Sequence, residues 1–426
     1  MKKKDKKILK VIIIIFLVVL VLFFSYYFIK KIIHKDINVN IPEESKYINV
    51  DYEYYFKSVA KMLKDKKLYT LENDELKEIG IVSNDVVLKL EKDNQLSHGY
   101  FKIKDTEFYI DYQDIEASED INEDISWKNY IPYNESIRTS DKTNLYLNDK
   151  LIFTINIGME LPIIIKEENY YGVIYKDKLY YIKHEECETF QNVNTELKHT
   201  NAISALVYHA TYDSNNSEEK QKCINNNATI CLSDIQFDEQ MKYLVDNNFY
   251  TATMNDLEKF IDSKVQLPEH TVVITIDDGY FADASVKVLE KYKLHATLFL
   301  IGALEETEWK TDAWYSSALE LHSHTYNMHG PNVCLGGQGS ALKCTAKETL
   351  LADLQKSREQ LNGSTVFCYP FFEYNDYAIS VLKEAGFTMA FAGGRQKIKV
   401  GSNKMTLSRY GIINTTNLND FKNVIY

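Results

Sequence analysis

The feature that most constrains the fold is a repeated alternation of apolar and amphipathic segments in the second half of the chain. It begins after a polar stretch at residues 191–200. Strands are expected at 203–208, 271–276, 296–301 and 366–369, and helices at 238–247, 284–292, 347–361 and 376–385. Because these strands are almost continuously apolar, they are expected to be parallel strands of a sheet that helices cover. Residues 201–426 are therefore predicted to form an α/β domain, either a barrel or a doubly wound sheet.

The region at about 36–190 has a different pattern. Short alternating runs, such as residues 100–103 and 145–147, predict β-strands joined by turns. Residues 104–110 faintly resemble residues 176–182, at a spacing of 72 residues. The alternative is chance similarity, since the chain contains 31 tyrosines. If the repeat is real, it predicts two tandem β-modules, similar to bacterial SH3-like domains, at about 40–116 and 127–188, with the acidic stretch 116–124 as a linker.

The N-terminus carries a lysine cluster followed by an uncharged segment. Residues 1–10 contain six lysines and one aspartate, and residues 11–29 contain no charge. At about 1.5 Å per residue, a helix of this length just crosses a hydrocarbon core of about 30 Å. The lysines predict that the N-terminus is cytoplasmic, so residues 1–35 are expected to form a single-pass anchor in the cell membrane, with the following domains outside. A cleaved signal peptide is the alternative, although no small-x-small cleavage site follows the apolar segment.

The charge of the chain restricts its partners. The formal net charge is −12, and most of the basic clustering lies before the predicted anchor. A protein that binds nucleic acid needs a basic surface to neutralise phosphates. We therefore expect no nucleic-acid partner.

Six cysteines agree with an exported chain. Cys223 and Cys231 bracket a polar, asparagine-rich loop, and Cys334 and Cys344 bracket a glycine-rich loop. Short closed loops of this kind are expected to be disulfides in an oxidising compartment. The alternative is four unpaired thiols. The other two cysteines cannot be assigned from the sequence.

Two adjacent carboxylates, Asp277 and Asp278, end the most apolar predicted strand and precede Gly279. Adjacent carboxylates repel each other unless a cation or a proton compensates them. Because successive strand residues point in different directions, one carboxylate can bind a metal while the other faces a water molecule. By itself, an Asp-Asp-Gly sequence is also an ordinary solvent-exposed turn.

Two histidines, His324 and His329, follow another apolar segment, within the sequence Ser-His-Thr-Tyr-Asn-Met-His. Two imidazoles and one carboxylate form a familiar ligand set for a divalent metal with open coordination positions. A spacing of five residues does not place both rings on one helical face, so the pair is expected at a strand end and its loop. His322 is a spare candidate, and two histidines that bind no metal are the alternative.

Other predicted strands also end in polar residues. Pro370 and Tyr374 lie after the strand at 366–369, and His209 follows the strand at 203–208. The alternative is an ordinary connecting loop and a structural histidine. Because active sites of barrel folds form at the carboxyl ends of the strands, these residues are candidates for one pocket.

In this order, the elements resemble the polysaccharide deacetylase family, the NodB-like carbohydrate esterases. The resemblance extends from about residue 202 to residue 426 and includes the runs at 237–241, 273–280 and 296–299. The Ser-His-Thr-x-x-Met-His form is most similar to the poly-N-acetylglucosamine deacetylase branch, since the histidines of the commoner branch lie one residue closer. The resemblance implies a distorted (β/α) barrel and a hydrolase that acts on linear amide C–N bonds.

The resemblance also implies roles for individual residues. Asp277 would be the general base, and the backbone N–H of Phe371 would contact the oxyanion, where one donor is worth about 3–4 kcal/mol. The ligands of a divalent metal would be Asp278, His324 and His329. Zinc is the expected ion, with nickel, cobalt, iron and manganese as alternatives. Such an ion would lower the pKa of a bound water molecule. Three further residues are expected to contact substrate: Tyr280, Pro370 and Tyr374.

The sequence departs from the family pattern at three places. No histidine follows the second ligand histidine, although many members have an acid histidine near the C-terminus. Val366 stands where an arginine is common, and Phe372 where a glycine is frequent. The acid that protonates the leaving amine is therefore either Asp277 or His209. Arg409 is expected either to pair with a carboxylate of the pocket or to cap the barrel.

Two functions of different classes remain open at this point. The first is removal of N-acetyl groups from N-acetylglucosamine residues of a cell-surface glycan, either peptidoglycan or poly-N-acetylglucosamine. The second is a catalytically silent protein that only binds cell-wall glycan. The four residues expected to bind metal and act as base favour the enzyme, because a silent barrel has no reason to keep all of them.

Overall fold

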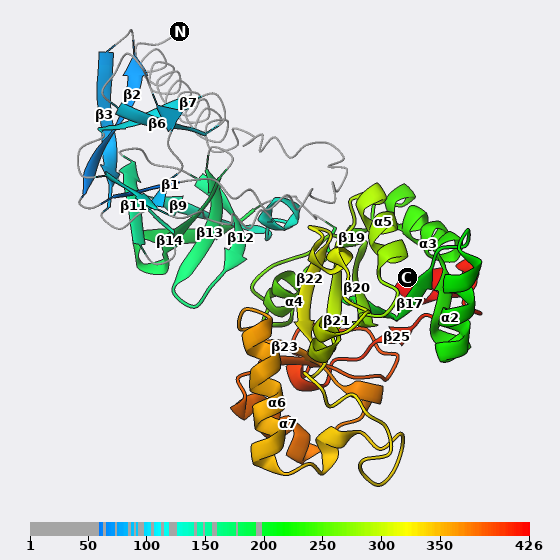
Figure 1. Ribbon diagram of the computed structural model, residues 1–426. Helices are drawn as coiled ribbons and strands as arrows, with labels where there is room; N and C mark the ends of the chain where they lie inside the picture. Colours follow the sequence, from blue (N-terminus) through cyan, green and yellow to red (C-terminus); the bar gives the residue numbers. More distant parts are fainter. Residues whose placement is uncertain are drawn as a thin grey trace, which may run out of the picture. The chain divides into compact units, whose positions relative to one another are not determined.

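The computed structural model describes residues 59–426, with short gaps that all lie before residue 198 (Figure 1). The chain separates into residues 1–46 and a second unit, residues 47–426, which contains every described element. The predicted membrane anchor lies outside the described residues. Among the residues that are described, no helix combines the length and the apolar character needed to cross a membrane.

The first part of the described chain is built from antiparallel strands. One sheet has the order β3-β2-β7-β6-β5, a second has the order β11-β10-β14-β13-β12-β9-β15, and a third has the order β4-β1-β8. The strands are β1 (Val59–Met62), β2 (Lys66–Glu72), β3 (Glu75–Val82), β4 (Val87–Leu88), β5 (Glu91–Lys92), β6 (His98–Ile103), β7 (Thr106–Asp111), β8 (Ile115–Ser118), β9 (Glu135–Thr139), β10 (Thr143–Leu147), β11 (Lys150–Ile155), β12 (Glu160–Lys166), β13 (Tyr170–Tyr175), β14 (Lys178–Lys183) and β15 (Cys187–Gln191).

The sequence repeat has a structural counterpart in these sheets. The order β3-β2-β7-β6-β5 corresponds to β11-β10-β14-β13-β12, and the repeated sequences fall on β7 and β14. Tyr69 of β2 pairs with Tyr109 of β7, and Tyr146 of β10 pairs with Tyr181 of β14 in the same way. Alternate residues of these strands enter one apolar core, as expected for strands with one buried face. The similarity to SH3-like domains stays a prediction.

The C-terminal domain is built on a parallel sheet of order β24-β23-β22-β21-β20-β16-β25, with β19 beside the start of β20. β17 and β18 form a separate parallel pair. All four strands predicted from the sequence are present, with ends that differ by at most two residues. The strands are β16 (Ser204–Tyr208), β17 (Ala210–Tyr212), β18 (Cys231–Ser233), β19 (Tyr250–Thr251), β20 (Thr271–Asp278), β21 (Ala296–Leu300), β22 (Leu319–Ser323), β23 (Val366–Cys368), β24 (Met389–Phe391) and β25 (Tyr410–Gly411).

Helices lie outside this sheet (Figure 1). They are α2 (Ser217–Asn227), α3 (Asp234–Asp246), α4 (Met254–Ile261), α5 (Asp283–Tyr292), α6 (Lys347–Gln360), α7 (Asp376–Glu384) and α8 (Leu418–Ile425). α3 begins with a capping box between Ser233 and Gln236, which satisfies backbone N–H groups that the first turn leaves free. Its apolar residues Phe237, Met241 and Leu244 are buried in the core that also holds the strands. The helices therefore cover strands that are apolar on both faces.

The predicted barrel is realised as a curled half-barrel. Within residues 201–426, all of which are described, strand pairing leaves β24 and β25 as the two edges. Only isolated bridges extend the edges, such as the one between Phe391 and Leu407, and β25 is two residues long. The chain between β24 and β25 is largely irregular and contributes isolated bridges instead of a full strand.

Both predicted disulfides are present, Cys223–Cys231 and Cys334–Cys344. The first differs from expectation in its surroundings, because Cys223 lies in helix α2 and not in a loop. Asn216 caps this helix by accepting a hydrogen bond from the N–H of Glu219 at 3.1 Å, and acidic residues in the first turn favour the helix dipole. These local signals outweigh the polar composition from which a loop was predicted.

Candidate active site and metal site

The candidate site lies where the central parallel strands end. Asp278 at the end of β20 is opposite Leu300 of β21, which in turn is opposite Ser323 of β22. His324 follows directly after Ser323. Because parallel strands end at one edge of the sheet, the Asp-Asp pair and the histidines come together although they are distant in sequence.

The three predicted metal ligands converge. Oδ1 of Asp278 lies 3.4 Å from Nε2 of His324 and 3.2 Å from Nε2 of His329. One ligand atom of each residue lies within 4.8 Å of the others. Oδ1 is buried and accepts no hydrogen bond from any described residue. Because a buried carboxylate oxygen without a donor is costly unless a cation compensates it, this donor set fits a divalent cation.

The orientation of His324 is fixed by a hydrogen bond to the backbone. Its Nδ1 lies 2.8 Å from the carbonyl oxygen of Cys368, which can only accept, so Nδ1 carries a proton and Nε2 faces Asp278. Burial lowers the pKa of His324, but Cys368 and Asp278 raise it well above its usual value. Burial and the neighbouring His324 lower the pKa of His329 to about 4. A proton on Nε2 of His324 and a metal ion are thus competing ways to compensate Asp278.

The loop between the two ligand histidines is held by a buried carboxylate. Asp353 of α6 accepts hydrogen bonds from the backbone N–H of Tyr326 at 2.9 Å and of Asn327 at 2.8 Å. Thr325, directly after His324, has a left-handed backbone conformation with φ 76°. The contacts with Asp353 therefore fix a loop that turns back sharply and directs His329 towards His324. The rings of the two histidines lie 4.6 Å apart.

His322, the spare candidate, does not belong to the ligand group. Its Nδ1 lies 2.7 Å from Oγ of Ser364, and its Nε2 lies 3.4 Å from a carboxylate oxygen of Glu320. Glu320 also lies 3.1 Å from Nε2 of His295. His322 is therefore part of a polar cluster separate from Asp278.

The second carboxylate, Asp277, forms a buried bidentate pair with Arg409. The two nitrogens of the guanidinium lie 2.6 and 2.8 Å from the two carboxylate oxygens, and the side chains are 2% and 0% exposed. Nη1 of Arg409 also donates to Oγ1 of Thr275 at 2.9 Å. Burial raises the pKa of Asp277, but Arg409 outweighs it and holds the pKa below its usual value. The expectation that Arg409 pairs with a pocket carboxylate is confirmed.

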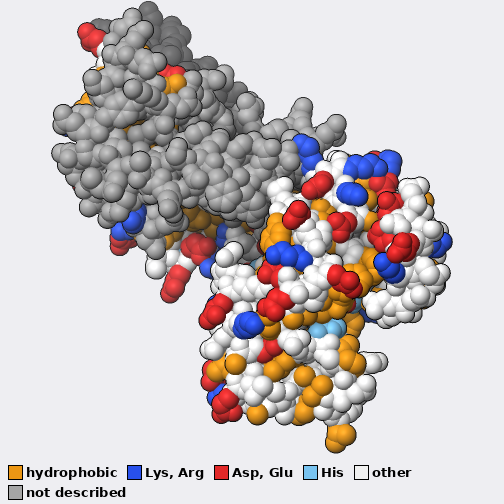
Figure 2. All heavy atoms as spheres, viewed as in Figure 1, with side chains coloured by type: hydrophobic (Ala, Val, Ile, Leu, Met, Phe, Trp, Pro, Cys, Tyr) orange, Lys and Arg blue, Asp and Glu red, His pale blue; other side chains and the backbone are white. Residues whose placement is uncertain are grey.

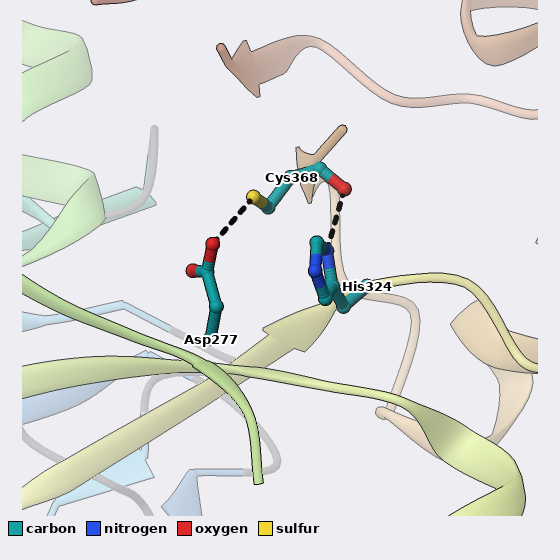
Figure 3. A group of neighbouring side chains, drawn as sticks. All are labelled: Asp277, His324 and Cys368. Carbon is teal, nitrogen blue, oxygen red and sulfur yellow. Dashed lines mark hydrogen bonds between the residues drawn. The ribbon is translucent and has the colours of Figure 1, made fainter. Parts of the chain in front are cut away.

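Cys368, at the end of β23, was given no role from the sequence, but it contacts both halves of the site (Figure 3). Its thiol donates to Oδ2 of Asp277 at 3.4 Å, and its carbonyl oxygen accepts from His324. The sulfur of Cys368 also accepts a hydrogen bond from Nη2 of Arg409 at 2.8 Å. Only its position at the end of a predicted strand, two residues before Pro370, could have indicated this.

Asp277, His324 and Cys368 form a second group whose ligand atoms lie within 4.8 Å of one another. Here the guanidinium of Arg409 already donates to both the carboxylate and the thiol. A divalent ion would have to bind beside this fixed positive charge, whereas Oδ1 of Asp278 has no such partner. The charge distribution therefore favours the group with Asp278, His324 and His329.

Phe371, whose N–H was expected to contact the oxyanion, lies beside the ligands, with its ring 4.8 Å from the ring of His329. Phe371 and Phe372 both have left-handed backbone conformations, with φ 59° and 62°. For residues with a Cβ atom this costs about 1–3 kcal/mol each, and such strain persists only where the surroundings fix it. Pro370 is buried just before this turn.

The other predicted residues surround the same place. The ring of Tyr280 contacts Trp309 at 4.9 Å, and burial and Asp278 raise the pKa of its hydroxyl. Nδ1 of His209 is buried and has no hydrogen-bond partner among the described residues, and its imidazole interacts electrostatically with both Asp277 and Asp278. The structure thus brings both aspartates, the two ligand histidines, His209 and Phe371 close together, whereas His322 lies in a separate cluster.

Two aromatic residues near the site are partly exposed. Figure 2 shows histidine side chains on the visible face of the C-terminal domain, bordered by hydrophobic side chains. Phe372 is 38% exposed and its ring lies 5.2 Å from the guanidinium carbon of Arg409. Tyr374 is 41% exposed and contacts Tyr369. Exposed aromatic rings beside a polar centre suit a ligand with one apolar and one polar face.

Comparison with known proteins gives a consistent family. Residues 264–390 match the model of the polysaccharide deacetylase family. A Bacillus subtilis protein named for the same family, YxkH, is 29% identical over 166 residues, which are 36% of this chain and 56% of that protein. A poly-β-1,6-N-acetyl-D-glucosamine N-deacetylase of Staphylococcus aureus is 25% identical over 201 residues, or 42% of this chain and 66% of that one. The chain thus spans less than two thirds of either relative.

Solved structures are also similar. The Streptococcus pyogenes deacetylase PplD covers 53% of this chain and 98% of its own length, with 19% identity and a TM-score of 0.44. The polysaccharide deacetylase BC0361 of Bacillus cereus covers 85% of this chain and 99% of its own length, with 16% identity and a TM-score of 0.44. Residues 264–390 of the C-terminal domain thus match the polysaccharide deacetylase family, the same family that the sequence motifs resemble.

Proposed function

We propose that this chain is a divalent-metal-dependent hydrolase that removes N-acetyl groups from N-acetylglucosamine residues of a cell-surface glycan. The observation that carries the proposal is the convergence of Asp278, His324 and His329 on a buried carboxylate oxygen without a hydrogen-bond donor. These three residues would hold the ion. A divalent ion in such a site supplies Lewis acidity and lowers the pKa of a water molecule towards about 7.

Asp277 is the proposed general base. It lies next to Asp278 in the chain, and Arg409 keeps it ionised and fixed in direction. An ionised carboxylate beside the ion can accept a proton from the attacking water as that water approaches the acetamide carbonyl. Arg409 acts through Asp277, so its proposed role is positioning.

The N–H of Phe371 is proposed to stabilise the oxyanion that develops on the acetamide oxygen. The contact between Phe371 and His329 supports this, because it keeps the turn beside the ligands. A fixed donor in a partly dry site stabilises developing charge without reorganisation. The amine that leaves needs a proton, which Asp277 can return or His209 can supply from the same edge of the sheet.

The proposed substrate is a poly-N-acetylglucosamine, with peptidoglycan as the alternative. The name of the Staphylococcus aureus relative supports the first, together with the Ser-His-Thr-x-x-Met-His form. The exposed rings of Phe372 and Tyr374 offer surfaces on which sugar rings can stack. Catalytically silent glycan binding is the competing function, but no observation favours it.

The proposal predicts metal-dependent acetate release. The detergent-solubilised full chain should release acetate from poly-β-1,6-N-acetylglucosamine oligomers faster than from purified peptidoglycan. Chelation should abolish release, and added zinc should restore it, because the base alone cannot activate water sufficiently. Faster release from peptidoglycan would reverse the substrate assignment. Glycan binding without any release of acetate would favour the silent alternative.

We also propose that residues 1–35 anchor the chain in the cell membrane, with the later domains outside. The lysine cluster before the uncharged segment supports this orientation. A reporter that functions only outside the cytoplasm, fused after Tyr426, should be active. A soluble mature form that lacks residues 1–30 would contradict the anchor.

A further inference from the structure

The disulfide-closed loop at residues 331–345 contacts the turn that carries Phe371. The carboxylate of Glu373 accepts hydrogen bonds from the backbone N–H of Gln338 and, at 3.0 Å, from that of Ser340. It also forms an ion pair with Lys343 at 2.7 Å, and both side chains are only 16% exposed. Burial raises the pKa of Glu373, but Lys343 and the two N–H groups lower it to about 2. The carboxylate of Glu373 therefore stays ionised, and each of its two oxygens accepts a hydrogen bond from a backbone N–H group.

Two further hydrogen bonds join the same segments. Nδ2 of Asn375 donates to the carbonyl oxygen of Lys343 at 3.0 Å. The hydroxyl of Tyr377 donates to the backbone carbonyl oxygen of Thr345 at 2.6 Å. The loop is shaped to receive the carboxylate, because a Cβ atom on Gly337, where φ is +64°, would overlap Glu373. The disulfide Cys334–Cys344 closes this loop on both sides of the groups that bind Glu373.

The turn at Phe371 and Phe372 needs support from outside. Its own hydrogen bonds, from the N–H of Phe372 to Tyr369 and from that of Glu373 to Pro370, close the turn. They do not connect it to another part of the domain. On the inner side, the two rings contact His329 and Arg409. On the outer side, the Glu373 carboxylate ties the end of the turn to the disulfide loop. A strained conformation held from both sides keeps a defined position.

We propose that Glu373 is a positioning residue for the Phe371 N–H, and that the Cys334–Cys344 disulfide fixes the partners of Glu373. The inference rests on the proposed deacetylase function. Glu373 touches neither the ligands nor Asp277, so it acts only through the turn. A displacement of the N–H by about 1 Å would reduce stabilisation of the transition state, and such displacements can cost about 100-fold in rate.

The test compares four variants of the full chain with the unmodified protein. Glu373→Ala should lower kcat for acetate release by about 10- to 100-fold, while KM and bound metal stay unchanged, since only the transition state uses the N–H. Glu373→Gln keeps only one of the two acceptor oxygens and loses the charge that pairs with Lys343, so it should lower kcat in the same direction but less than Glu373→Ala. The paired change Cys334→Ser and Cys344→Ser should lower kcat in the same direction. Glu384→Ala removes an exposed pair with Lys347 in the same domain and should change nothing.

The outcomes separate this inference from the proposed function. If the unmodified protein releases no acetate, the proposed function is wrong. If it is active and Glu373→Ala has the same kcat, the Glu373 inference alone is wrong. A loss of activity in Glu373→Ala that matches a loss of metal would also overturn it, because the residue would then support the ligands. If Glu373→Ala does not fold, unchanged kcat in the cysteine pair decides against the inference.

Discussion

Replacing Arg409 with methionine should lower the free energy of unfolding by about 3–5 kcal/mol, because Asp277 would remain as a buried charge without its partner. The two side chains are almost completely inaccessible, and no other cation contacts Asp277 among the described residues. Acetate release should fall as well, since the base would lose both its fixed direction and the positive charge that keeps it ionised.

The stability effect can be isolated with two controls. Arg138 forms an ion pair with Glu160 at the surface, where the side chains are 58% and 33% exposed, so Arg138→Met should cost at most about 1 kcal/mol. Combining Arg409→Met with Asp277→Asn removes the unpaired charge and should recover part of the lost stability. Urea denaturation at fixed metal concentration measures all three. An Arg409→Met protein as stable as the unmodified chain would show that the pair is not needed to compensate Asp277.

Four strands and four helices of the C-terminal domain could be predicted from the sequence because their physical signals are local, whereas shorter elements such as β24, β25 and α8 were not predicted. Strands buried on both faces are almost continuously apolar, and β20 was placed to within two residues of its end. The spacing of His324 and His329 excluded a shared helical face, and both lie at the end of β22 and in the loop after it. These inferences depend on periodicity and residue type alone.

The contacts that complete the site depend on tertiary structure and could not be predicted in the same way. Arg409 is 132 residues from Asp277, and the position where the family commonly has an arginine is occupied by Val366. Cys368 joins the base to a ligand histidine only because β23 and β22 are neighbours. Asp353 holds the histidine loop from the side of α6, and no motif indicates it.

Whether the sheet closes into a full barrel could also not be predicted from the sequence. Repeated βα units predict parallel strands, but they do not determine whether the first and last strands meet. Here β24 and β25 remain edges, and the largely irregular chain between them carries Leu407 and Arg409. The irregular segment between the two edge strands therefore also supplies the arginine that pairs with Asp277.

We propose that Asp278, His324 and His329 hold a metal ion while Asp277 acts as the base. His324→Ala should lose both bound metal and acetate release, because it removes a ligand that a backbone hydrogen bond orients. Asp277→Asn should behave differently. It leaves all three ligands in place, so metal should remain bound, while the rate should fall by about 10²- to 10⁴-fold from loss of the general base.

A matched control is available in His322, which contacts Ser364 and Glu320 and not Asp278. His322→Asn should keep both the metal and acetate release. The decisive measurement is metal content by elemental analysis beside acetate release from a poly-N-acetylglucosamine oligomer, for these three variants and the unmodified chain. We expect Asp277→Asn to bind metal without releasing acetate, and His324→Ala neither to bind metal nor to release acetate. Full metal content in His324→Ala, or acetate release that survives in both variants, would contradict it.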